Sequence, residues 1–179
     1  NQLWQGIFGA RSPKLTTSTP LQFNLEGTEI EVAFSPDHSP ELRIVNEILK
    51  AGQTADLLMF TFAKSTTIDD ALKSRLEAKA VQVRGVLDRS QAAHNFSPHP
   101  ELIAAGARLR RDTLPGQSKL HHKLLVLDGK VAMGGSFNYT GPANQFNDEN
   151  LFIIRNPVVA AHFRAEVSRV FNNLAEEFP

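Results

Sequence analysis

The residues best suited to chemistry lie in one short stretch, residues 121–138, which reads HHKLLVLDGKVAMGGSFN. The polar side chains at its two ends carry imidazole, ammonium, hydroxyl and amide groups. Lysine and asparagine can hold the non-bridging oxygens of a phosphate, and an imidazole can attack phosphorus or transfer a proton. This combination indicates phosphodiester chemistry that uses no metal ion.

The spacing of these residues predicts a β-hairpin that brings the polar groups together. Asp128-Gly129 separates two apolar runs and favours a two-residue type I′ turn. In the register that this turn sets, Lys123 lies opposite Gly134, and alternate residues of a strand share one face of the sheet. The face predicted to form the site carries His121, Lys123, Ser136 and Asn138. The face predicted to form the core carries Leu124, Val126, Val131 and Met133.

Metal-dependent and lipase-type chemistry fit the stretch poorly. Adjacent strand residues point to opposite faces, so His121 and His122 do not share one metal ion, and His122 is expected to be structural or at the rim. The chain has no cysteine and no HExxH spacing, so we expect no zinc site and no cofactor. Asn138 stands where a GxSxG nucleophile elbow requires glycine, so Ser136 is not a lipase-type nucleophile.

Strand and helix patterns alternate along the rest of the chain and predict an α/β fold. The sheet is expected to be mixed and mostly parallel, with helices on both faces. Strands are predicted in 28–34, 56–62, 81–87, 107–111 and 148–155, and helices in 41–51, 67–79, 101–105 and 158–174. The buried face of the first helix is predicted to carry Leu42, Val45, Ile48 and Leu49.

Two domain-level segments are expected. Residues 28–179 form a single domain, and residues 1–27 form a helix tail followed by a linker rich in Thr, Ser and Pro. Residues 1–8, NQLWQGIF, share spaced aromatic and Leu residues with the C-terminal helix. They are either an unrelated amphipathic helix or the tail of a preceding copy of the same domain.

Composition fits a globular domain with no global attraction to polyanions. The 179 residues are 41% hydrophobic and 21% charged, with 19 basic and 19 acidic residues and a formal net charge of zero. Binding to a nucleic acid would therefore depend on a local patch. The apolar runs are too short to span a bilayer. No signal peptide is visible, but the chain starts at Asn1 rather than Met, so the compartment stays open.

The fixed residues of the central stretch resemble the HKD signature of the phospholipase D superfamily. The pattern is H-x-K-x4-D followed by G-S-x-N. It is carried by His121, Lys123, Asp128, Gly135, Ser136 and Asn138. The downstream FNDEN is similar to the acidic segment of the bacterial nuclease branch, with Glu149 as the matching carboxylate. The resemblance implies a phospholipase D-like layered sandwich.

The resemblance also implies an active site built from two HKD motifs. In the family one histidine forms a covalent phosphohistidine, and a histidine of the second motif protonates the leaving oxygen. This chain has one motif, so the second would come from a homodimer mate or from an upstream half of the same polypeptide. His121, Lys123, Asp128 and Glu149 would be the catalytic set, and Lys123, Ser136 and Asn138 would hold the phosphate. Glu149 would orient or stabilise an imidazole. Asp-Gly turn chemistry alone explains Asp128, for which we favour a structural role.

Three functions follow as hypotheses. The first is a metal-independent phosphodiesterase acting on nucleic acid. The alternatives are a phospholipase D acting on phosphatidyl lipids and a non-catalytic nucleic-acid-binding half. Residues 108–130 are locally basic, either as a rim that tracks phosphates or as an ordinary solvated face. The basic side chains in question are Arg108, Arg110, Arg111, Lys119, Lys123 and Lys130.

Overall fold

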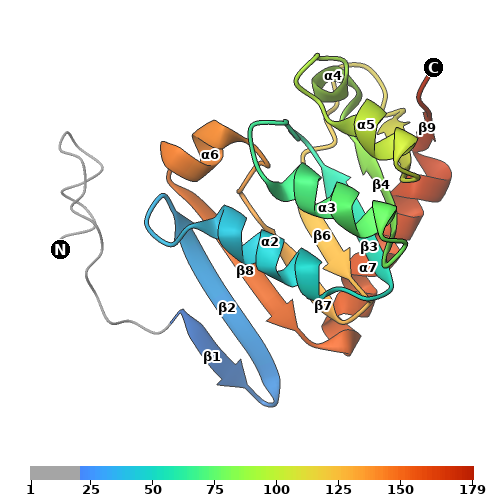
Figure 1. Cartoon of the computed structure of the whole chain (residues 1–179). Helices are drawn as coiled ribbons and strands as arrows, with labels where there is room; N and C mark the ends of the chain where they lie inside the picture. The colour runs from blue at the N-terminus through green and yellow to red at the C-terminus, as the bar shows by residue number, and fades with distance from the viewer. Residues whose placement is uncertain (1–20) are drawn as a thin grey trace.

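A computed structural model describes residues 21–179 as one nine-stranded sheet with the strand order β1-β2-β8-β7-β6-β3-β4-β5-β9 (Figure 1). The strands are β1 (Gln22–Leu25), β2 (Thr28–Ser35), β3 (Thr54–Met59), β4 (Gln82–Leu87), β5 (Arg108–Asp112), β6 (Lys123–Leu127), β7 (Val131–Gly135), β8 (Glu149–Arg155) and β9 (Ala175–Glu177). The helices are α2 (Pro40–Lys50), α3 (Ile68–Glu77), α4 (Arg89–Ala92), α5 (His99–Ala104), α6 (Gly141–Gln145) and α7 (Pro157–Asn173). Among these residues, no helix has both the length and the hydropathy that a bilayer crossing requires.

Helices cover both faces of the sheet, as the sequence predicts. In Figure 1, α2, α3 and α5 lie in front of the strands and α7 lies behind them. Neighbouring residues of the central strands alternate between the two layers. In β3, Leu57 packs toward α2 and α3, and Leu58 packs toward α7. Burial on both faces explains why this strand reads as a continuous apolar run.

The sheet is mixed, but the expectation that it is mostly parallel is wrong. Of the eight strand pairings, only β3·β4 and β4·β5 are parallel. Parallel neighbours need a long crossover, which α3 and the α4–α5 segment supply here. Among the antiparallel pairs, short turns join β1 to β2 and β6 to β7. Residues 22–25, inside the predicted linker, form β1 and pair with β2. The predicted helix at residues 1–8 lies outside the described residues.

The β6–β7 hairpin has the predicted turn but not the predicted register. Asp128 and Gly129 have φ values of 53° and 61°, the left-handed backbone that a type I′ turn requires at both positions. Lys130 adds one residue to the connection, so Leu127 pairs with Val131. A slip of one residue exchanges the faces of a strand. Val131 and Met133 therefore pack on the α2 and α3 side of the sheet, whereas Leu124 and Val126 pack on the α7 side. The prediction that these four residues share one face is wrong.

The buried face of α2 also differs from the prediction. Ile48 is buried and Val45 packs against the core as predicted, but Leu42 and Leu49 are 58% and 49% exposed, and Ile44 is buried in their place. The rotation lets Glu47, also buried, accept a hydrogen bond of 2.9 Å from Arg155 on β8. A buried carboxylate must be paired, so this contact outweighs the exposure of two leucines.

Asp128 fastens the hairpin turn to the loop between α2 and β3. Its carboxylate accepts hydrogen bonds from the backbone N–H groups of Gly52, Gln53 and Thr54, at 2.8–2.9 Å. Its own N–H donates to the Thr54 carbonyl oxygen at 2.9 Å. Burial alone would raise the pKa of Asp128, but these backbone donors outweigh it and hold the pKa below its ordinary value.

We predict that Asp128→Ala lowers the free energy of unfolding by about 2 kcal/mol, because three backbone donors lose an anionic acceptor and alanine is strained at positive φ. Asp128→Asn, which tolerates this backbone and keeps one acceptor oxygen, should lose about half as much. A lowered folded-state pKa stabilises the protein above the unfolded-state pKa. The difference between wild type and Asp128→Ala should therefore be constant near neutral pH and shrink as the pH falls through the folded-state pKa. Urea denaturation between pH 3 and pH 7 measures both effects; an equal loss at every pH would contradict the assignment.

Candidate active site

The strand directions place five of the six predicted site residues at one end of the sheet. Because β7 is antiparallel to both β6 and β8, the last residue of β7 lies at the end where β6 and β8 begin. His121 precedes β6, and Lys123 and Glu149 are the first residues of β6 and β8. Ser136 and Asn138 follow β7. This is the upper end of these strands in Figure 1, near α4 and α6. The residues meet through strand ends, not through the strand parity that the hairpin register predicted.

Lys123 and His121 are in direct contact. The Lys123 Nζ lies 3.1 Å from both the Nδ1 and the Nε2 of His121 and 3.0 Å from its carbonyl oxygen. The ammonium can therefore donate to whichever ring nitrogen carries no proton. His121 is exposed and Lys123 is only 7% exposed. A reactive imidazole at the surface is thus backed by a buried cation.

Phe60, which directly follows β3, supports this pair. Its ring centroid lies 4.5 Å from that of His121 and 4.9 Å from the Lys123 Nζ. The Phe60 N–H donates to the His122 carbonyl oxygen at 2.8 Å, which ties the histidine segment to the end of β3. The sequence pattern predicts only that Phe60 belongs to a strand, residues 56–62, and gives it no role at the site. Its place directly after a buried strand that ends beside β6 was the one signal for this role.

Lys123 has no counter-ion among residues 21–179, since none of their carboxylate oxygens lies within 4.0 Å of Nζ. Burial lowers the pKa of Lys123, and the more distant charge of Glu149 opposes that shift. A buried cation without a paired anion is costly unless a ligand supplies the negative charge. The arrangement is therefore suited to binding an anion beside His121.

Ser136 and Glu149 are held by the ends of β7, β8 and β2. The Ser136 Oγ accepts a hydrogen bond of 3.0 Å from the Asn150 N–H and keeps its own proton available to donate. Glu149 accepts from the Asn147 side chain at 3.1 Å, and its N–H donates to the Ser35 Oγ at 3.2 Å. Glu149 therefore makes no direct hydrogen bond to His121 in the described part of the chain.

Asn138 and Gly135 complete the arrangement after β7. The Oδ1 atom of Asn138 is buried and has no hydrogen-bond partner among the described residues. Oδ1 is an acceptor, so only the side-chain NH2 group of Asn138 could donate to a phosphate oxygen. Gly135 has a φ of 141°, and an added Cβ would lie 2.3 Å from the Asn150 carbonyl oxygen. Close approach of the two strand ends thus explains the glycine of the G-S-x-N pattern.

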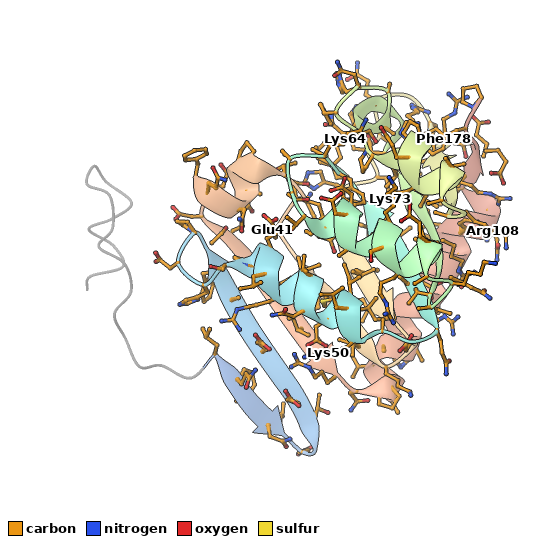
Figure 2. All side chains as sticks on the ribbon, viewed as in Figure 1. Glu41, Lys50, Lys64, Lys73, Arg108 and Phe178 are labelled. Atoms are coloured by element: carbon orange, nitrogen blue, oxygen red, sulfur yellow. The ribbon has the colours of Figure 1, made fainter. Side chains whose placement is uncertain are left out.

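The structure places Asp128 away from the other predicted catalytic residues. It follows β6, whereas Lys123 begins it, so the strand separates the two by about 15 Å. For part of the basic stretch, the structure favours the second interpretation, an ordinary solvated face. Arg110 and Arg111 pair with Glu177 and Glu176 of β9. Figure 2 shows Arg108 at the same edge of the sheet, where its guanidinium lies over Phe171.

Comparison with known proteins identifies the family. A family model described as the cardiolipin synthase PLD-like domain matches residues 44–171. The chain belongs to the phospholipase D superfamily. A phospholipase D from Rickettsia conorii is 30% identical over 139 residues, which cover 78% of this chain and 68% of the relative. A mitochondrial cardiolipin hydrolase from Xenopus tropicalis is 32% identical over 129 residues, 72% of this chain. The chain spans 60% of the length of that hydrolase.

Solved structures agree with this assignment at the level of the fold. Nuc, a phospholipase D family member from Salmonella typhimurium, superposes with a TM-score of 0.75 and 24% identity. The match covers 84% of this chain and 99% of Nuc. The phospholipase D-like α/β fold predicted from the HKD pattern is therefore confirmed.

We predict that Lys123→Met abolishes most activity while leaving stability nearly unchanged. Methionine keeps the apolar stem but removes the charge that would face an anion, so hydrolysis of a phosphodiester should fall by about a thousandfold. The loss of the contacts to His121 and Phe60 is offset by the removal of an uncompensated buried charge, which leaves a net change within about 1 kcal/mol. Steady-state kinetics and urea denaturation measure the two effects. A large loss of stability with full activity would show that Lys123 is structural.

Proposed function

We propose that the chain is a metal-independent phosphodiesterase in which His121 forms a covalent phosphohistidine. The observation that supports this function most strongly is the buried Lys123 ammonium, 3.1 Å from the ring nitrogens of an exposed histidine and without a carboxylate partner in residues 21–179. A phosphodiester bound there would supply the missing negative charge and place its phosphorus beside the imidazole. Asn138 and the hydroxyl of Ser136 would donate to the remaining oxygens.

The reaction has two steps. A ring nitrogen of His121 attacks phosphorus, the bond to the leaving oxygen breaks, and that oxygen takes a proton from the histidine of a second HKD motif. Water then attacks phosphorus and gives its proton to that second histidine, and the phosphorus–nitrogen bond breaks. Both imidazoles return to their starting state. The Lys123 ammonium offsets the negative charge on the phosphate oxygens in both steps.

We propose that a second copy of this chain supplies the second motif. A two-fold interface at the exposed His121 would bring two identical imidazoles to one phosphate. Either His121 could then act as the nucleophile while the other acts as the acid. An upstream motif in the same polypeptide would supply the same chemistry without a dimer.

The substrate we propose is a nucleic acid. Asp88, at the end of β4, accepts from the Leu120 N–H at 3.1 Å, so the loop before His121 lies against the start of α4. Lys119 from this loop donates to the Ser90 Oγ at 2.8 Å, and Arg89 donates to the Gly116 carbonyl oxygen. Within the described residues, neither cation has a carboxylate within 4.0 Å. With Lys123, these side chains form a local basic patch suited to a chain of phosphates.

A phospholipid is the second candidate, favoured by two exposed aromatic residues near the same end of the sheet. Phe34 and Phe146 are 46% and 74% exposed. Phe34 precedes Ser35, which pairs with Glu149, and Phe146 ends α6. Exposed aromatic side chains beside a phosphate site could enter a lipid surface. The names of the Rickettsia and Xenopus relatives agree with this candidate.

His121→Asn should abolish turnover, and mixing it with wild type tests the composite site. If each site needs a histidine from both subunits, activity should follow the square of the wild-type fraction. An equal mixture after subunit exchange should then retain about one quarter of the activity, against about one half if each chain acts alone. Asp128→Asn is the control, because its carboxyl group lies far from His121, and it should retain most activity. A linear dependence would exclude the dimeric site.

Substrate class and metal independence can be tested together. Single-stranded DNA, duplex DNA and phosphatidylglycerol vesicles are incubated with the protein in excess EDTA. We expect cleavage of DNA to persist in EDTA and to exceed cleavage of lipid. Preferred cleavage of lipid would support the phospholipase, loss of activity on adding EDTA would contradict the metal-free mechanism, and binding of DNA without cleavage would support a non-catalytic role.

A further inference from the structure

A cavity adjoins His121 and Lys123 on the side of the sheet that α7 covers. It has a volume of about 450 Å³, and both His121 and Lys123 contribute to its wall. Its other walls come from β6, β7, β8 and α7. A group attached to a phosphate at Lys123 would therefore reach the cavity directly, because the two sites share these residues.

The cavity combines an aromatic interior with a polar rim. Leu124, Phe152 and Phe163 form the apolar walls, and the two phenylalanine rings lie 5.9 Å apart at 40°. His162 and Glu166 of α7 line the cavity as well and provide groups that can form hydrogen bonds. Ligand pockets commonly have this composition, with apolar and aromatic walls and a few polar groups that fix orientation.

His122 lines the same cavity, and one of its ring nitrogens makes no hydrogen bond to the described residues. Its Nε2 lies 3.5 Å from the Oε1 of Glu166, and Arg169 fixes that carboxylate with two hydrogen bonds of 2.7 Å. The Nδ1 of His122 is buried and has no partner among the described residues. Burial lowers the pKa of His122, which the charge of Glu166 opposes. The contact with Glu166 thus holds the His122 ring in place, while its Nδ1 has no partner among the described residues.

We propose that this cavity receives the nucleobase next to the scissile phosphate, a role that rests on the nuclease function proposed above. A base has flat apolar faces that pack against aromatic rings and an edge of donors and acceptors that His122, His162 and Glu166 can meet. An acyl chain would fill the apolar interior but would leave these polar groups facing hydrocarbon. A base can enter only when it is unstacked, so the cavity favours single strands over duplexes.

The test compares two substrates that carry the same phosphates. One is a short oligothymidylate, and the other is an oligomer of equal length in which every residue is abasic. Wild type should cleave the thymidylate with a kcat/KM about tenfold higher, as expected for one stacked base. Phe163→Leu keeps an apolar side chain but removes the ring, and should abolish most of that preference while cleavage of the abasic oligomer stays unchanged.

The matched control is Phe23→Leu on β1, an exposed phenylalanine at the edge of the sheet remote from the cavity, which should keep the wild-type ratio. Should Phe163→Leu fail to fold in thermal denaturation, His162→Ala at an exposed position provides the same test with a smaller expected loss.

An equal loss on both oligomers would show that Phe163 only supports the fold and would overturn the proposal. An unchanged ratio, or a selective loss on phosphatidylglycerol vesicles, would overturn it too. Failure of wild type to cleave either oligomer would instead reject the nuclease function itself.

Discussion

The site depends on the hydrogen bonds that the Asp128 carboxylate accepts from the backbone N–H groups of residues 52–54. They join the β6–β7 turn to the start of β3, and so set the register of three neighbouring strands at the end remote from the chemistry. Register matters here because a slip of one residue would turn Lys123 to the other face of the sheet. The aspartate of the HKD pattern thus acts on His121 only through the length of β6. This accounts for a charged residue in the signature that lies at the opposite end of β6 from His121.

At the other end of the same strands, some positively charged side chains have no carboxylate partner among the described residues. Most arginines of the described chain are paired, and the buried Asp56 alone holds both Arg84 and Arg164. Within residues 21–179, the cations near the site without a carboxylate partner are Arg89, Lys119 and Lys123. A protein with zero formal net charge can therefore still present a local positive potential, since pairing cancels charge elsewhere.

The sequence was a good guide wherever local chemistry decides structure. The left-handed Asp-Gly turn, the alternation of strands and helices, and the residue types around His121 could all be predicted from neighbouring residues. The prediction was wrong where distant contacts decide. Lys130 fits equally well inside or outside the turn until β8 pairs with β7, and α2 turns its leucines outward because Glu47 meets Arg155, more than one hundred residues away in the sequence. The role of Phe60 depends in the same way on β3 and β6 being neighbours.

His121 and Lys123 also form part of the wall of the cavity beneath α7. His121 is exposed and His122, the next residue, is half-buried, and both line the cavity on the sheet face that α7 covers. Under the two proposals, these adjacent histidines would have separate tasks, attack on phosphorus by His121 and recognition of the attached group by His122. The Phe60 N–H donates to the His122 carbonyl oxygen. Because His121 and His122 are adjacent in the segment that this bond holds, a ligand that shifts His122 would also shift His121. Binding of a ligand in the cavity would then change the position of His121, the proposed nucleophile. Discrimination between substrates should therefore appear in kcat as well as in KM.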